Sequence, residues 1–232
     1  AKDIGARCLA ILHQFCEAEN HSIVGIFTNP RGQAIRDYAR EHNLQLQGEL
    51  EELSGLPPAD YLISVQYHLI LRGRHLCKGE RLAINLHLAP LPEYRGCNQF
   101  SFAIVDGARE FGTTIHEIDT GIDSGGIIFE CRFPIPEDCF VNDLYELTFN
   151  HSITMFSAAL PKLFSGDYVV TPQSEFEGER VSGFHYRKEI DELKQINLEW
   201  SAERIIRHVR ATSMHGFPPP LPSLETNKLN SW

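Results

Sequence analysis

The alternation of short apolar runs with amphipathic segments is the feature that most constrains the fold of this chain. Residues 22–29 and 60–65 have the length and the β-branched and aromatic content of buried strands. Strands that alternate with helices predict a parallel sheet with crossover helices, and therefore an α/β domain. The expected elements are, in order, a helix at 3–17, the strand at 22–29, a helix at 33–43, strands at 60–65 and 82–87, and a helix at 98–106.

The chain begins with a helix where a sheet of this kind normally begins with a strand. Residues 1–5 have the character of the turn that follows a first strand. We therefore expect that the first strand is missing from the given chain. Because that strand is usually central, a molecule that truly lacked it should be unstable.

The pattern changes in the second half of the chain. Two strand-like segments at 111–118 and 126–135 are joined by a loop that contains Asp123, and a long amphipathic helix is expected at 141–164. Pro161 should kink this helix or end it early. We expect an N-terminal catalytic domain at 1–165 and a smaller mixed region at 166–232, which is the candidate for dimer and nucleotide contacts.

Composition excludes several classes of protein. The formal charge of −10 argues against general nucleic-acid binding, which usually depends on a basic surface. No apolar run reaches the roughly 18–20 residues of a membrane span, and no signal peptide is visible, so a cytoplasmic location is expected. The six cysteines form no CxxC pair and the eleven histidines are scattered, which predicts reduced thiols and no metal site.

Three polar residues have the chemistry needed to move an acyl group onto an amine. Asn85 and His87 are two apart at the end of an apolar run, so a strand would point both side chains to one face. Asp123 follows His87 by 36 residues (123 − 87), in a glycine-flanked loop that can return it to the imidazole. Taken alone, Asn85 or His87 is more often a polar residue at a strand end. The three together favour catalysis.

The motifs around these residues occur in a fixed order. Asn85-x-His87 is followed by the proline-rich turn 88–92, by Tyr94-Arg95-Gly96, by residues 112–116 and by Asp119-x-Gly121-x-Asp123-x-Gly125. This order resembles the formyltetrahydrofolate-dependent formyltransferases, most densely over residues 59–135. The resemblance implies a Rossmann-like formyltransferase fold and N10-formyltetrahydrofolate as the co-substrate. It also implies that His87 moves protons, Asn85 stabilises the oxyanion and Asp123 orients the imidazole.

The resemblance places the folate between the end of the strand at 60–65 and the loop 119–126. Glycines in this loop let the backbone approach a pterin closely, although a plain turn between two strands needs them as well. Ligands of parallel sheets bind at the carboxyl ends of the strands. The candidate cofactor-binding residues are Gln66, Tyr67, Leu69, Asp119, Gly121 and Ile122, of which Tyr67 has packing as its alternative role.

The segment 94–102 most resembles the sugar-nucleotide N-formyltransferases, which act on dTDP- or GDP-linked amino sugars. The expected acceptor is dTDP-4-amino-4,6-dideoxyglucose, for surface-polysaccharide (lipopolysaccharide O-antigen) synthesis. A pyrophosphate needs cationic side chains and a base needs an aromatic platform. The candidate substrate-binding residues are Arg95, Gly96, Asn98, Gln99, Tyr186, Arg187, Lys188 and Trp200, with Phe217 as a further platform.

Several of these residues have an alternative, structural role. Arg187 and Lys188 also suit a solvated helix start, Trp200 suits a core anchor, and His116 is as consistent with a structural histidine as with one near the substrate. Glycinamide ribonucleotide formyltransferase and a folate- or nucleotide-binding relative without catalysis are the alternative functions. The resemblance further implies a homodimer and a cis peptide bond at Leu91-Pro92.

Overall fold

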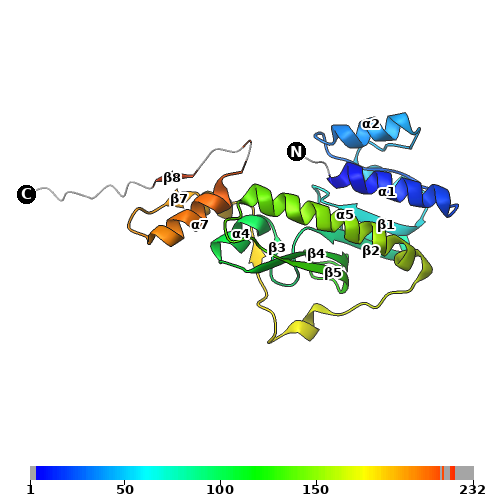
Figure 1. Ribbon diagram of the computed structural model, residues 1–232. Coiled ribbons are helices and arrows are strands. Elements are labelled where there is room, and N and C mark those ends of the chain that lie inside the picture. The colour runs from blue at the N-terminus through cyan, green and yellow to red at the C-terminus, as the bar shows by residue number, and fades with distance from the viewer. Residues whose placement is uncertain (1–3, 215, 217–219, 223–232) are drawn as a thin grey trace, which may run out of the picture.

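A four-stranded sheet in the order β1-β2-β4-β5 is the centre of the computed structural model, which describes residues 4–214, 216 and 220–222 (Figure 1). β1 and β2 are parallel, whereas β4 is antiparallel to both β2 and β5. The α/β class is thus confirmed, with a parallel pair at one end of the sheet and a meander at the other. The strands are β1 (Ala59–Val65), β2 (Gly79–His87), β4 (Glu110–Glu117) and β5 (Ile127–Pro134).

Helices and short strands surround this sheet. Figure 1 shows α7 beside the first turns of α5, with α1 and α2 towards its other end. The helices are α1 (Ile4–Ala18), α2 (Gln33–Glu41), α3 (Gly73–Leu76), α4 (Gln99–Val105), α5 (Val141–Ser165), α6 (Glu189–Leu193) and α7 (Ala202–Thr212), with 3-10 turns η1 (Leu50–Gly55) and η2 (Gln173–Phe176). Two short parallel pairs are β3 (Arg95–Gly96) with β6 (Phe184–His185), and β7 (Gln195–Ile196) with β8 (Leu221–Pro222).

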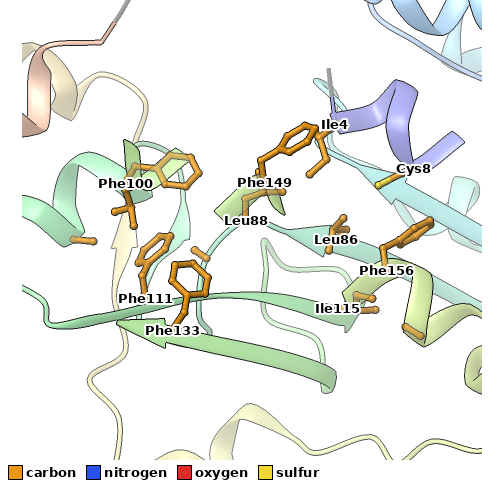
Figure 2. Close-up of a cluster of buried hydrophobic side chains, with 14 of the residues drawn as sticks. Ile4, Cys8, Leu86, Leu88, Phe100, Phe111, Ile115, Phe133, Phe149 and Phe156 are labelled. Carbon is orange, nitrogen blue, oxygen red and sulfur yellow. The ribbon is translucent and has the colours of Figure 1, made fainter. Parts of the chain in front are cut away.

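The main core lies between the sheet and α5. Phe111 on β4 contacts both Phe100 on α4 and Phe133 on β5, while Phe149 and Phe156 of α5 cover the strands further along (Figure 2). Each such ring contributes roughly 1.5–3 kcal/mol when it leaves water. This packing fixes the strands whose ends carry the polar residues described below.

The strand predicted at 22–29 does not form. Only Ile26 makes a β-bridge, to Leu46, and its backbone pairs with residues 45 and 47. Residues 22–27 are separated from β1 by a cavity of about 600 Å3 that α1 also lines. A strand requires a paired neighbour, so the apolar character of 22–29 was not sufficient, and within the described residues the sheet ends at β1.

The long helix expected at 141–164 forms as α5, and the region after it includes a second capped helix, α7. α5 continues through Pro161 to Ser165, so the early end, one of the two effects predicted for this proline, does not occur. The proline lies in the last turns, where one lost backbone hydrogen bond matters least. Gly166 ends the helix with a φ of 81°, a conformation that favours glycine. Ser201 caps α7 by accepting a hydrogen bond from the amide of Arg204.

Two further expectations can be compared with the structure. The Leu91-Pro92 peptide bond is cis, as predicted. Within the described ranges, no helix combines the length and the apolar character needed to cross a membrane. Phe217 lies outside the described residues.

Candidate active site

The ends of β1, β2 and β4 bring the predicted polar residues together. The parallel register pairs Ser64 with Asn85, and the antiparallel register pairs Asn85 with His116. Because alternate residues of β2 face opposite sides, the buried Ile84 and Leu86 face the core while Asn85 and His87 share the other face. Asn85, His87 and Asp123 are the residues predicted to be catalytic; together with His116, which contacts Asn85 and Asp123, we call them the catalytic centre.

His87 is almost completely buried, and its two ring nitrogens have different neighbours. Nε2 lies 2.8 Å from the carbonyl oxygen of Tyr94. Since a carbonyl can only accept, the proton of the neutral ring is on Nε2, and Nδ1 is the basic nitrogen. Nδ1 lies 3.7 Å from Oδ1 of Asp123. Burial lowers the pKa of His87, while Asp123 and the Tyr94 carbonyl oppose that effect, so the ring is a neutral base with a carboxylate ready to stabilise its cation.

The loop 119–126 holds Asp123 in a left-handed backbone conformation, with a φ of 52°. Oδ1 of Asp119 accepts hydrogen bonds from the Gly121 amide at 2.9 Å and the Ser124 hydroxyl at 2.8 Å. A Cβ on Gly125 would lie 2.0 Å from the carbonyl oxygen of Glu117, so only glycine fits there. The loop is therefore constrained by its own residues on both sides of Asp123.

The Asp123 carboxylate has a hydrogen-bond donor at one oxygen and two imidazole rings beside the other. Oδ2 accepts a hydrogen bond from the amide of Gly96 at 2.9 Å, and Oδ1 lies 3.6 Å from Nε2 of His116. Burial would raise the pKa of Asp123, but its contact with the His116 ring, the charge of His87 and the Gly96 amide lower it to about 2. Asp123 is thus an anion at neutral pH.

His116 lies inside the catalytic centre rather than at its edge. Its Nδ1 donates to the carbonyl oxygen of Glu117 at 2.7 Å, so Nε2 of the neutral ring is an acceptor. The side-chain amide of Asn85 lies 3.2 Å from that nitrogen and donates to it. This bond orients the Asn85 amide, whose second N–H has no partner among the described residues.

The cofactor-binding candidates lie on two segments next to this centre. Gln66 directly follows β1, is exposed and has a φ of 50°. Leu69 and Ile122 are 43% and 41% exposed, so both leave apolar surface open to a ligand. Tyr67 also lines the cavity beside β1, and burial raises its pKa, which agrees with the packing alternative.

Several acceptor candidates support the site from within the chain. Arg95 donates to the Ser182 hydroxyl at 2.8 Å, and the Asn98 amide donates to the carbonyl oxygens of Tyr186 and Arg187 at 3.0 and 3.1 Å. Gln99 is buried at the start of α4. The Gly96 amide is bonded to Asp123, as above. In this structure these residues join the 94–99 turn to the C-terminal segment, and direct contact with a substrate stays a prediction.

The remaining candidates are more exposed. Tyr186, Arg187 and Lys188, which we call the acceptor rim, are all exposed; the side chains of Arg187 and Lys188 make no hydrogen bond or ion pair with another described residue. Trp200 instead packs against α7, with its ring 4.5 Å from His208 and 3.9 Å from the Arg204 guanidinium. These contacts agree with the anchor alternative for Trp200.

Sequence reasoning did not single out Gln173 or Arg180. Gln173 donates to two carbonyl oxygens of the Asp123 loop, and the Arg180 guanidinium forms a bidentate ion pair with the carboxylate of Glu130 on β5. Both partners are about 50 residues away in the chain, and both residues lie in a polar, loop-like stretch without periodicity, so no local signal identifies them. Within the residues described, no group of three or more histidine, cysteine, aspartate or glutamate side chains is placed to hold a metal ion.

Structural comparison shows the fold independently of sequence. The chain superposes on an N-formyltransferase from Helicobacter canadensis, solved in complex with folinic acid and dTDP-3-aminofucose, with a TM-score of 0.79. The match covers 97% of this chain and 81% of that one, at 23% identity. At this identity the likeness shows the fold alone.

Sequence comparisons agree with this assignment. The chain is 29% identical over 160 residues to a GDP-perosamine N-formyltransferase from Brucella melitensis, covering 69% of this chain and 59% of that enzyme. It is 28% identical over 212 residues to a methionyl-tRNA formyltransferase from Kosmotoga olearia, covering 83% of this chain and 66% of that enzyme. The chain thus spans about three fifths of the length of the first of these relatives. Residues 18–160, more than half of the chain, match the family described as formyl transferase, and the chain therefore belongs to that family.

Proposed function

We propose that this protein transfers a formyl group from N10-formyltetrahydrofolate to the amine of a nucleotide-linked amino sugar. One observation carries the proposal: an amide, an imidazole and a carboxylate are brought together at the ends of β2 and the Asp123 loop, with Nδ1 of His87 3.7 Å from Asp123. Family membership supports the type of reaction. Because Asn85, His87 and Asp123 are all present, catalysis is favoured over the alternative function, in which the protein only binds folate or nucleotide.

The residues on the donor side fit a folate. Leu69, shortly after β1, and Ile122, next to Asp123 in the chain, present exposed apolar surface, and the backbone of loop 119–126 offers polar groups to a pterin. Gln66, Tyr67, Asp119 and Gly121 complete this proposed donor site. Folinic acid in the Helicobacter canadensis structure supports the same choice of ligand. When bound, the donor supplies the formyl carbon.

The catalytic centre performs three tasks in this proposal. His87 accepts at Nδ1 the proton that the attacking amine loses, and returns it to the leaving nitrogen as the carbon–nitrogen bond to the donor breaks. Asp123 stabilises the imidazolium between these two transfers. Asn85, oriented by His116, donates its second N–H to the oxygen that gains charge in the tetrahedral intermediate.

On the acceptor side, the acceptor rim and the 95–99 turn contain the groups that a nucleotide diphosphate requires. Arg187 and Lys188 are exposed cations without partners among the described residues, and Tyr186 offers an exposed ring. The proposed acceptor is dTDP-4-amino-4,6-dideoxyglucose, for surface-polysaccharide synthesis by a cytoplasmic homodimer. The names of the relatives include one GDP-linked and one dTDP-linked amino sugar, so the base is an outcome of the test.

The test is turnover of N10-formyltetrahydrofolate with a panel of dTDP- and GDP-linked amino sugars, using protein with its native N-terminus. Glycinamide ribonucleotide and methionyl-tRNA serve as competing acceptors. Selective formylation of an amino sugar nucleotide is the expected result. Preference for glycinamide ribonucleotide would assign the protein to purine synthesis. If no acceptor were formylated although folate still bound, the alternative of a protein that binds folate or nucleotide without catalysis would be supported.

A further inference from the structure

The side chain of Gln173 reaches from the C-terminal segment into the loop that carries Asp123. Its Nε2 donates to the carbonyl oxygens of Asp123, at 2.9 Å, and Gly125, at 2.8 Å. The orientation of this amide is unambiguous, since the reverse orientation would place Oε1 against two carbonyl oxygens. Gln173 therefore bridges the backbone on both sides of Ser124.

The segment that carries Gln173 is itself fixed to the sheet. Thr171 and Ile127 exchange two backbone hydrogen bonds of 2.8 Å at the point where the loop enters β5. The side chain of Val170 packs over Gly126 so closely that a Cβ there would lie 2.3 Å from it. Gln173 thus extends from a segment that is fixed to the sheet. Its two hydrogen bonds therefore limit the motion of the loop, because Gln173 does not move with it.

The backbone at Asp123 needs such a restriction. Its φ of 52° places it in the left-handed region, which costs a residue other than glycine roughly 1–2 kcal/mol. The bonds from Asp119 hold the loop on either side of Asp123, at Gly121 and Ser124, whereas Gln173 holds the carbonyl of Asp123 itself. A rotation of this peptide would move the carboxylate away from both imidazoles.

We propose that Gln173 is a positioning residue for the catalytic centre: its amide maintains the left-handed backbone at Asp123, and thereby directs the carboxylate towards His87 and His116. Gln173 acts through Asp123 and contacts no reacting atom in this proposal. The expected effect of Gln173 on turnover rests on the proposed function, whereas its expected effect on the backbone of the Asp123 loop does not.

The first test compares Gln173→Ala with Glu175→Gln, an exposed carboxylate in the same 3-10 turn. With an acceptor that the wild type formylates, Gln173→Ala should lower kcat about ten- to a hundredfold and change the KM for that acceptor less than about threefold, because misplacing a catalytic group mainly affects the chemical step. Glu175→Gln should stay within about twofold of the wild type. Full activity of Gln173→Ala would overturn the inference.

A double-mutant cycle separates positioning from general structural support. If Gln173 acts only through Asp123, then Gln173→Ala should cost less than about twofold in an Asp123→Asn background. The groups that face His87 are Asp123, His116 and the Tyr94 carbonyl. Because Asp123 raises the pKa of His87, a loosened carboxylate should move the acid limb of the kcat/KM profile of Gln173→Ala to lower pH. Losses that multiply in the double variant would overturn the inference.

A measurement that requires no turnover tests the role of Gln173 separately from the proposed function. Hydrogen exchange of the amides at 120–126 should be at least about tenfold faster in Gln173→Ala than in the wild type, with exchange in α5 unchanged. Unchanged exchange in the loop would overturn the role of Gln173 whether or not the protein is active. A silent wild type would instead count against the proposed function, and the exchange experiment would still decide this inference.

Discussion

The catalytic centre and the acceptor rim belong to one proposed site but differ in how they are held. In the catalytic centre each imidazole is buried, and the side chains are linked by contacts of 2.7–3.7 Å to one another or to the backbone. In the acceptor rim, Arg187 and Lys188 are exposed and make no side-chain hydrogen bond with a described residue. Buried polar groups must be paired, whereas exposed ones need not be. The chemistry is therefore fixed by the fold, while the choice of acceptor can change at little cost in stability.

Removing a group from the catalytic centre should give the largest effect. His87→Ala and Asp123→Ala should each lower kcat about 10³–10⁴-fold, because the base or the stabiliser of its cation is lost. Nucleotide binding should change little, since neither residue belongs to the acceptor rim. Steady-state kinetics at high enzyme concentration measure this, with the exposed His42→Ala as control. Full activity in either variant would remove the mechanism.

Asn85→Ala should have the next largest effect. Loss of one donor to a developing oxyanion costs about 10²–10³ in kcat, with substrate KM values nearly unchanged. The exposed Asn150→Ala in α5 provides the control. If instead KM rose and kcat were preserved, Asn85 would bind the ground state, and the contrast between the two regions would weaken.

The charge of Asp123 should be visible in acid unfolding. Burial raises its pKa, but His116, His87 and the Gly96 amide lower it overall, to about 2 in the folded protein, below the ordinary value near 4. A carboxyl with a depressed folded pKa stabilises the protein above its unfolded pKa, and that contribution, about 2 kcal/mol, is lost as the pH falls from about 4 to about 2. Urea unfolding across this range should show a smaller loss in Asp123→Asn than in the wild type. The exposed Asp60→Asn should keep the full loss.

The contrast between the buried catalytic centre and the exposed acceptor rim also explains which residues the sequence predicts well. Asn85 and His87 follow from strand periodicity, since the apolar Ile84 and Leu86 that alternate with them define the buried face of β2. Asp123 required the ordered motifs as well, because its distance from His87 depends on a loop. The strand at 22–29 failed for the opposite reason: its residues suit a strand, but whether it pairs depends on a neighbour that local sequence does not specify.

The remaining parts of the site could not be predicted from the sequence because they depend on contacts between segments far apart in the chain. The Asn85–His116 hydrogen bond depends on the β2–β4 register, and the Gln173 contacts depend on a segment fifty residues after the loop. Side chains of the acceptor rim have few partners, so neither sequence nor fold determines what they bind. These residues are therefore best tested by changes in affinity rather than in rate.

Tyr186→Ala should affect the acceptor but not the chemistry. Stacking on a nucleotide base is worth about 1–3 kcal/mol, and 1.4 kcal/mol is tenfold in affinity. We expect the KM for the amino sugar nucleotide to rise about tenfold, with kcat within about threefold. Tyr186→Phe keeps the ring and should behave like the wild type. An unchanged KM in Tyr186→Ala would remove this residue from the acceptor rim.

Trp200→Phe should have the smallest effect on activity, and it decides between the two roles predicted for this residue. The ring packs on His208 and under the Arg204 guanidinium, contacts that lie within the α7 region. If Trp200 is an anchor, the acceptor KM should change less than about twofold, while the free energy of unfolding falls by about 1 kcal/mol.

The matched variant is Arg204→Gln, which removes the cation over the ring and leaves Trp200 in place. As an anchor contact, this change should lower stability by about 0.5–1 kcal/mol without affecting the acceptor KM. A rise in KM for Trp200→Phe with stability unchanged would instead make Trp200 a stacking platform. It would then belong to the acceptor side of the site, and the rim would extend from residue 186 to the start of α7.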